Sequence, residues 1–199
     1  MSEQPVVAYQ GEAGAYSEQA VRQQFGETAV PLPCHTFSDI FVAVADGRTR
    51  FGMLPIENSL AGTVIPAYDL LIDHDFRVQA EVVLRVEHCL MAPAGTKLAD
   101  IRRVRSHHQA LAQCEKTLKR MGLEPVDYYD TAGAARDLAA NPEPHTAAIA
   151  SALAAETYGL EILARNVEDL DFNFTRFFVL GRGEPARQDP SKTSIIFTT

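Results

Sequence analysis

The sequence has little cysteine, and its cysteines are not spaced for joint use. Cys34, Cys89 and Cys114 lie far apart, and no Cys-x-x-Cys or mixed Cys/His spacing occurs. This argues against a disulfide framework and against a zinc site. We therefore expect reduced, buried thiols in a cytoplasmic protein that binds no metal.

Basic residues are also scarce. Lys and Arg number 18 against 26 Asp and Glu, which gives a net charge of −8. Nonspecific nucleic-acid binding rests on basic patches, so we expect no nucleic-acid partner. The N-terminus carries no basic segment followed by an apolar one, and no apolar run reaches the length of a membrane span. We expect no membrane association.

Two common enzyme signatures are missing. No Gly-x-Ser-x-Gly nucleophile elbow occurs, which argues against a hydrolase with a Ser-His-Asp triad. Gly11 and Gly14 resemble part of a dinucleotide loop, but Ser17 occupies the third glycine position, and we reject that interpretation. His107 and His108 have no second set of ligands at metal-binding spacing, so a capping or surface role is favoured.

Apolar strands alternate with amphipathic helices along the chain. The pattern predicts strands at 6–9, 29–34, 51–54, 78–91, 104–106, 126–129, 146–150 and 177–180, and helices opened by Ser17, Ser38, Thr131 and Ser151, over Val64 to Leu71 and over Gln109 to Met121. Such alternation is typical of α/β proteins with largely parallel sheets. The segment 78–91 is the longest strand, and we expect it to cross between two lobes.

These elements predict a two-lobed domain over 1–183. Lobe one covers about 1–78 and lobe two about 79–180, and the final strand is free to return to lobe one. The segment 184–192 is rich in Gly, Pro and charge and is typical of a linker. The segment 193–199 has the pattern of one further strand, the expected start of another domain.

Small polar residues follow several predicted strands directly. These junctions are Gly11 to Ser17, Glu57 to Ser59, Ser106 to Gln109, Asp130 to Ala132, and Ser151. In open α/β sheets ligands gather beyond the carboxyl ends of strands, where helix N-termini favour anions. Helix capping explains each junction taken alone. Together they predict a cleft for a small, negatively charged molecule.

Two motifs add ligand-capable side chains. In Pro55-Ile56-Glu57-Asn58-Ser59, Glu57 is placed to orient the loop, and Asn58 and Ser59 to donate to a ligand. The run 173–178 puts Thr175 and Arg176 among three Phe residues. Arg suits a carboxylate, but when the run is taken alone, a strand start with a surface Arg is the favoured explanation.

Taken together, these motifs resemble the prephenate dehydratase family. The similar segments are Tyr9 to Ser17, Pro55 to Ser59 with Gly62, Ser106 to Gln113, Thr131 to Ala135, Ala147 to Ser151, and Asn173 to Phe177. The resemblance implies two α/β lobes with a central cleft, like type II periplasmic binding proteins. It implies a hydro-lyase that converts prephenate to phenylpyruvate, water and CO2 in phenylalanine biosynthesis, with no metal and no organic cofactor.

The resemblance also assigns roles to residues. Thr175 corresponds to the family's catalytic Thr. Positions associated with substrate binding or site geometry correspond to Asn58, Ser59, Ser106, Gln113, Thr131 and Arg176, with Glu57, Gly14 and Phe177 in support. From the carboxylate role of Arg176, we expect its loss chiefly to weaken substrate binding.

The chain departs from the family pattern at three places. His108 stands where Pro is common, and Asp130 stands where some members carry Glu. Members commonly continue into an ACT domain that binds phenylalanine, and 193–199 resembles the opening strand of one that is truncated here. The resemblance also implies a homodimer, with L-phenylalanine as a partner only where an ACT domain is present.

Two alternatives stay open. Arogenate differs from prephenate by an amine in place of a keto group, so an arogenate dehydratase fits the same residues. A non-catalytic binding module for small anions would keep the lobes without the chemistry. The intact Thr175-Arg176-Phe177 argues against this second alternative, because a binding module has no need of that hydroxyl.

Overall fold

The computed structural model describes residues 4–185, 189, 191–193 and 195. Its elements are, in order, β1 (Val6–Gln10), α1 (Tyr16–Phe25), β2 (Val30–Cys34), α2 (Phe37–Ala45), β3 (Phe51–Asn58), β4 (Gly62–Thr63), α3 (Ile65–Asp73), β5 (Arg77–Arg85), β6 (Cys89–Ala92), η1 (Leu98–Asp100), β7 (Arg103–His107), α4 (His108–Gln113), α5 (Glu115–Met121), β8 (Glu124–Tyr128), α6 (Thr131–Ala140), β9 (Thr146–Ala150), α7 (Ala152–Tyr158), β10 (Glu161–Ala164) and β11 (Phe174–Gly181). No helix in these described ranges is long and apolar enough to span a bilayer.

The chain divides into two compact α/β units, as the alternating pattern predicts. Unit 1 contains residues 1–10, 20–84 and 174–199, and unit 2 contains 11–19 and 85–173. The segment 78–91 does pass from one unit to the other, but the prediction of one continuous strand is wrong. The chain leaves the β5 ladder before His88, whose backbone N–H donates to the Glu168 carboxylate, and β6 then joins the second sheet.

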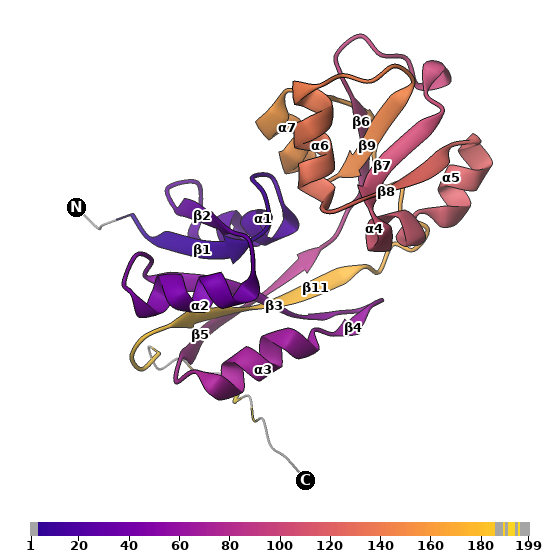
Figure 1. Cartoon of the computed structure of the whole chain (residues 1–199). Coiled ribbons are helices and arrows are strands. Elements are labelled where there is room, and N and C mark those ends of the chain that lie inside the picture. Colours follow the sequence, from indigo (N-terminus) through magenta and orange to yellow (C-terminus); the bar gives the residue numbers. More distant parts are fainter. Residues whose placement is uncertain (1–3, 186–188, 190, 194, 196–199) are drawn as a thin grey trace. The chain divides into compact units, whose positions relative to one another are not determined.

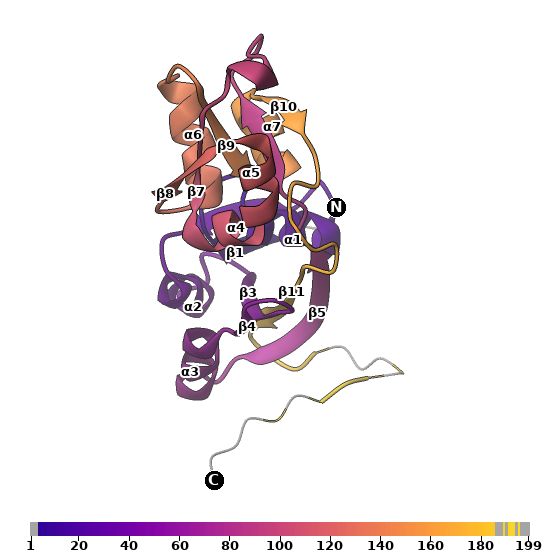
Figure 2. The ribbon, with the colours of Figure 1, turned by 90° about the vertical axis from the view of Figure 1, so that its right-hand side faces the viewer.

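Unit 1 is built on a sheet with the strand order β2-β1-β3-β11-β5, in which β4 pairs with β3. Strand β1 is parallel to β2 and β3, whereas β11 is antiparallel to β3. Helices α2 and α3 lie side by side over one face (Figures 1 and 2). Buried Ile40 and Phe41 of α2 meet Leu54 and Ile56 of β3 there and form the core.

Unit 2 has a sheet with the order β10-β6-β9-β7-β8. Strands β7, β8 and β9 are parallel, and β6 runs antiparallel to β9 and β10. Helices α4 and α5 cover one face and α6 and α7 the other (Figures 1 and 2). The prediction of largely parallel sheets is therefore wrong for both units. Each sheet is mixed, because β11 runs antiparallel to β3 in unit 1, and β6 runs antiparallel to β9 and β10 in unit 2.

Strand β3 is longer than the apolar pattern predicts. Its pairing with β11 extends through Glu57 and Asn58, so the Pro55–Asn58 segment is a strand and not a loop. The register shifts between Arg176 and Phe177, where Phe177 pairs with Pro55. Proline has no backbone N–H to give to a ladder, and an irregularity at this point accommodates it.

Two predicted helix caps are also displaced. Ser17 lies inside α1, and α2 is capped by Thr36 instead of Ser38. The Thr36 hydroxyl accepts from the Asp39 backbone N–H, and the Asp39 carboxylate accepts from the Thr36 N–H. This reciprocal capping box satisfies two backbone donors at once, so it outcompetes the single cap that Ser38 offers.

The single helix predicted over Gln109 to Met121 is divided in two at Cys114. The cause lies far away in the sequence. The Asp169 carboxylate accepts from the backbone N–H groups of Lys116 and Thr117, and the Asp169 N–H donates to the Gln113 carbonyl. Asp169 thus caps the start of α5, while Leu111, Cys114 and Leu118 stay on the predicted buried face.

Candidate active site

Thr175 lies on β11 directly opposite Asn58 of β3. The Asn58 side-chain amide donates to the Thr175 hydroxyl oxygen at 3.0 Å and to the Phe174 carbonyl at 3.2 Å. Because the hydroxyl oxygen is used as an acceptor, its own proton is left for another partner. Donation into a hydroxyl also makes it a better donor. The geometry therefore prepares Thr175 to give a hydrogen bond.

The orientation of the Asn58 amide is fixed by the turn that follows it. Its carbonyl oxygen accepts from the Leu60 N–H at 3.0 Å and from the Ala61 N–H at 2.9 Å. Only the amide nitrogen can then face Thr175. Ser59 holds the opposite strand, because its hydroxyl accepts from the Phe174 N–H at 2.9 Å and its N–H donates to the Phe174 carbonyl. Asn58 and Ser59 thus fix the backbone around Thr175.

Arg176 pairs with Glu57 in the β3–β11 ladder. Because successive residues of a strand point to opposite faces of the sheet, the Arg176 side chain lies on the other face from Thr175. Its guanidinium lies 3.3 Å from the Glu57 carboxylate and 3.0 Å from that of Glu81. It also stacks over the Phe178 ring at 5.3 Å. These contacts tie β11 to β3 and β5. The substrate-binding role of Arg176 stays a prediction, and its surroundings favour a bracing role.

In unit 2, the segment Gly11 to Ser17 is held beside the starts of two helices. The Ser151 hydroxyl, which caps α7, donates to the Gly14 carbonyl at 2.5 Å, and the Gly14 N–H donates to Glu18. Gly14 has a φ of +83°, and a β-carbon there would lie 2.6 Å from the Ala154 Cα. Only glycine fits this approach, which gives the predicted supporting residue a defined packing role.

Thr131 begins α6, and Asp130 caps it by accepting from the Gly133 N–H at 2.7 Å. Burial raises the pKa of the Asp130 carboxyl. The carboxylate of Glu12 lies nearby, held by Arg136 at 2.8 Å. No hydrogen bond engages the Thr131 hydroxyl within the described ranges. The Thr131 hydroxyl can therefore donate a hydrogen bond to a ligand at this helix start.

Gln113 takes part in a buried hydrogen-bond chain. Its side-chain oxygen accepts from His88 Nε2 at 2.8 Å and from the Asn173 amide at 2.9 Å. His88 therefore carries its proton on Nε2, and its Nδ1 faces the Tyr16 hydroxyl at 2.6 Å. Burial lowers the pKa of His88, which keeps the ring neutral. Gln113 thereby fixes Asn173, the residue immediately before β11.

Ser106 and the two neighbouring histidines stand at the carboxyl end of β7. Ser106 is fully buried and its hydroxyl donates to the Ile149 carbonyl at 2.7 Å, which ties β7 to β9. His107 caps α4 by accepting from the Gln109 N–H, and His108 packs against its ring at 4.1 Å. The predicted capping role of one histidine is confirmed, and Ser106 acts on the geometry of the strand end.

The three cysteines are free and buried. Burial raises the pKa of the Cys89 thiol, as it does for Cys34 and Cys114, so all three stay protonated and unreactive. Within the described part of the chain, no group of three His, Cys, Asp or Glu residues is arranged to hold a metal ion.

Comparison with known proteins identifies the family. A model of the prephenate dehydratase family matches residues 7–185. The chain belongs to the prephenate dehydratase family. It is 46% identical over 196 residues to the arogenate dehydratase/prephenate dehydratase 2 of Arabidopsis thaliana, covering 96% of this chain and 51% of that protein. It is 44% identical to arogenate dehydratase 2 of Petunia hybrida, covering 96% of this chain and 49% of that protein.

Bacterial relatives agree with this membership. A Komagataeibacter europaeus protein named bifunctional N-acyl-homoserine lactone acylase/prephenate dehydratase is 46% identical, covering 96% of this chain and 67% of that protein. The crystal structure of the Arthrobacter aurescens prephenate dehydratase in complex with L-Phe is 29% identical with a TM-score of 0.84, covering 92% of this chain and 63% of that one. The chain spans about half the length of the plant relatives it matches.

Several residues that support the site escape prediction from sequence. His88 and Asp169 are conspicuous in the structure, but no local pattern singles them out. Gln113 lies 25 residues from His88 and 60 from Asn173. Only the fold shows that these side chains share one hydrogen-bond chain.

Proposed function

We propose that the chain catalyses the decarboxylating dehydration of prephenate to phenylpyruvate. Prephenate carries one carboxylate and one hydroxyl on its cyclohexadiene ring and a second carboxylate on its pyruvyl side chain. Breaking the bond to the ring carboxylate releases CO2 and leaves an electron pair that completes the aromatic ring. The C–O bond breaks at the same time, and the hydroxyl leaves with its electron pair as hydroxide, which a proton converts to water. The enzyme has to help that oxygen depart and to hold the ring in place.

Thr175 carries the proposal. Its hydroxyl accepts from Asn58, and its proton has no acceptor among the described residues. A Thr hydroxyl is a weak acid, so a strong hydrogen bond to the departing oxygen describes its role better than full proton transfer. The leaving group gathers negative charge only as the bond breaks, so this interaction favours the transition state over the bound substrate.

The remaining predicted site residues support this chemistry in two ways. We propose that the free Thr131 hydroxyl binds substrate directly. Ser106 and Gln113 position other groups, since Ser106 joins two strands and the Gln113 oxygen is engaged by His88 and Asn173. Weak binding of the ring carboxylate suits the reaction, because that group must leave.

The deciding experiment incubates the purified chain with prephenate and follows phenylpyruvate. Wild type is compared with Thr175→Ala, which should fold normally and lose most turnover. Product from wild type and its loss in the variant support the proposal. Binding of prephenate without product at micromolar enzyme would instead favour the non-catalytic binding module.

Arogenate is the second candidate substrate. Relatives bear the names arogenate dehydratase and arogenate dehydratase/prephenate dehydratase, and the two substrates differ by one amine. The ratio of kcat/KM for the two acids decides between them.

We further propose that the protein is a cytoplasmic homodimer. The three buried free thiols support the proposed compartment. We propose a role for L-phenylalanine only in a protein that continues into an ACT domain.

A further inference from the structure

Unit 1 contains a cavity of about 910 Å³ at the opposite end of its sheet from Thr175. All of its lining residues belong to unit 1. Phe51, which lines the cavity, is the first residue of β3. Asn58, which pairs with Thr175, is the last residue of the same strand. Seven strand steps of about 3.3 Å separate the two ends by roughly 23 Å. The cavity is therefore distinct from the candidate active site.

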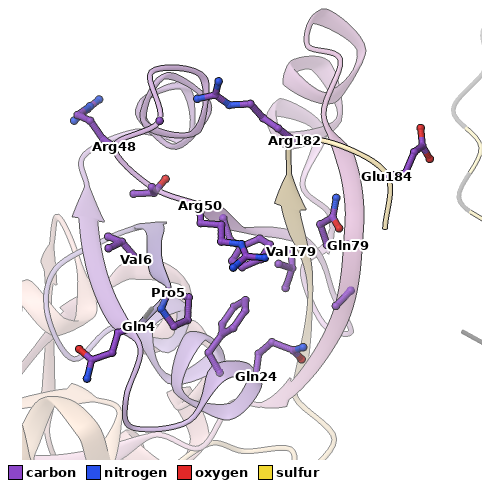
Figure 3. Close-up of a pocket in the computed structure, with 15 residues that line it drawn as sticks. Gln4, Pro5, Val6, Gln24, Arg48, Arg50, Gln79, Val179, Arg182 and Glu184 are labelled. Carbon is purple, nitrogen blue, oxygen red and sulfur yellow. The ribbon is translucent and has the colours of Figure 1, made fainter. Parts of the chain in front are cut away.

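Positive charge dominates this cavity. Arg48, Arg50 and Arg182 line it with one carboxylate, Glu184. Glu184 is mostly exposed and lies 3.5 Å from Arg77, and Arg48 is directed toward Asp46 at 3.9 Å. Figure 3 shows Arg48 and Glu184 pointing away from the cavity and Arg50 reaching toward its middle. No carboxylate in the described ranges pairs with Arg50 or Arg182.

A buried hydroxyl lines the same cavity. Thr49 is 3% exposed, and its hydroxyl finds no hydrogen-bond partner among the described residues. Burying a hydroxyl without a partner is unfavourable, and such groups call for an explanation. The hydroxyl oxygen has almost no accessible surface of its own, so the anionic oxygen of a ligand would satisfy it once the Thr49 side chain rotates toward the cavity.

The backbone holds these groups in place without a ligand. The Thr49 N–H donates to the Ala43 carbonyl at 3.1 Å, and the Arg50 N–H donates to the Val6 carbonyl at 3.0 Å. Arg182 is fixed by its Nε, which donates to the Val44 carbonyl at 2.7 Å. The guanidinium carbon of Arg50 lies over the Phe51 ring, 5.1 Å from its centre, where a cation is attracted by the ring.

The rest of the wall is apolar and aromatic. The rings of Phe25 and Phe51 stack at 5.1 Å, and Pro5, Val6 and Ala80 lie beside them. We infer that this cavity binds a small organic acid with a flat, apolar body. Its carboxylate is held by Arg50 and Thr49, and its body lies against Phe25 and Phe51. The inference does not depend on the dehydratase reaction, because no residue of that site lines the cavity.

The test titrates the full chain with 3-phenylpropionate by calorimetry. The neutral 3-phenylpropanamide and inorganic phosphate serve as matched probes that lack the charge and the apolar body, respectively. Removing a charged hydrogen-bond partner should weaken 3-phenylpropionate binding roughly tenfold to hundredfold in Arg50→Gln. Arg85→Gln, which removes an arginine that lies outside the cavity and pairs with Glu87, should bind like wild type.

Thr49→Val provides a second variant that keeps the side-chain shape. It should raise the melting temperature of the unliganded chain, because it removes an unpaired buried hydroxyl, and it should weaken 3-phenylpropionate binding. The inference is overturned if 3-phenylpropionate does not bind at millimolar concentration, or if Arg50→Gln and Thr49→Val bind it as wild type does. Equal affinity for either matched probe also overturns it.

Discussion

The side-chain amide of Asn58 donates a 3.0 Å hydrogen bond to the Thr175 hydroxyl. The two residues are 117 positions apart in the sequence and directly opposite each other in the β3–β11 ladder. Since two backbone N–H groups hold the Asn58 oxygen, the pair has a fixed polarity, and the Thr175 proton has no acceptor among the described residues. Any catalytic role of Thr175 then depends on Asn58.

The first prediction concerns Thr175 itself. Thr175→Ala should lower kcat for phenylpyruvate formation by about 10²- to 10⁴-fold, because it removes the donor to the leaving oxygen. Thr175→Ser keeps the hydroxyl and should retain most activity. Circular dichroism melting checks that both variants fold. Turnover of Thr175→Ala at the level of the Ser variant would contradict the assignment.

The second prediction concerns the coupling of Asn58 to Thr175. Asn58→Ala should also reduce kcat, because the hydroxyl then loses the donor that orients it. The double variant with Thr175→Ala should be about as slow as Thr175→Ala alone, since residues that act as a unit are not additive. Multiplied effects in the double variant would show that Asn58 acts on the substrate independently.

The third prediction concerns Arg176, whose position changes the expectation from sequence. It lies on the opposite sheet face from Thr175, between Glu57 and Glu81. Arg176→Ala should therefore lower the free energy of unfolding by about 1 kcal/mol, a modest loss because the side chains are partly exposed. Urea denaturation measures it, and Arg85→Ala, which breaks one exposed pair with Glu87, is the control. A large rise in KM with unchanged stability would restore the carboxylate-binding role.

The sequence predicts best what local chemistry determines. Strand β9 begins and ends at the predicted residues, and α7 has Ser151 as its cap and Gly159, with φ +68°, as its end. These signals lie within a few residues of the structure they specify.

Long-range pairing explains the predictions that were wrong. The helix over Gln109 to Met121 is broken by Asp169, which is 52 residues beyond Thr117. Strand β3 continues past Leu54 because β11 provides a ladder partner. The chain of Tyr16, His88 and Gln113 is likewise created by the fold. The family resemblance locates Thr175 and Asn58, but only the structure shows that their side chains are hydrogen-bonded to each other.

The fourth prediction concerns the helix cap formed by Asp169 and how its contribution to stability changes at acidic pH. Burial raises the pKa of the Asp169 carboxyl, but the N–H donors of Lys116 and Thr117 outweigh it, and the net shift is downward. Because the pKa of this carboxyl is lower in the folded chain than in the unfolded chain, its ionised form stabilises the fold at pH values above the unfolded pKa of about 3.9. This stabilisation is lost as the pH falls through the folded pKa. Asp169→Ala should cost about 1 kcal/mol at neutral pH.

The pH dependence separates the charge of Asp169 from its packing. Chemical denaturation of wild type and Asp169→Ala should show a gap in stability that narrows as pH falls below about 4. Asp169→Asn keeps an acceptor without the charge, so its loss at neutral pH should be smaller than that of Asp169→Ala. A gap that stays constant with pH would assign the stabilisation to packing.

The last prediction concerns Gly14. A β-carbon there would lie 2.6 Å from the Ala154 Cα, whereas one at Gly159 would meet nothing within 4 Å. Both residues have positive φ, at +83° and +68°, so Gly159→Ala reports backbone strain alone. Gly159→Ala should cost about 1 kcal/mol and Gly14→Ala about 3 kcal/mol or more, because the second must also displace α7. Thermal melting compares them. Equal losses would mean that the segment Gly11 to Ser17 yields freely, in which case the Ser151 bond to the Gly14 carbonyl does not hold it.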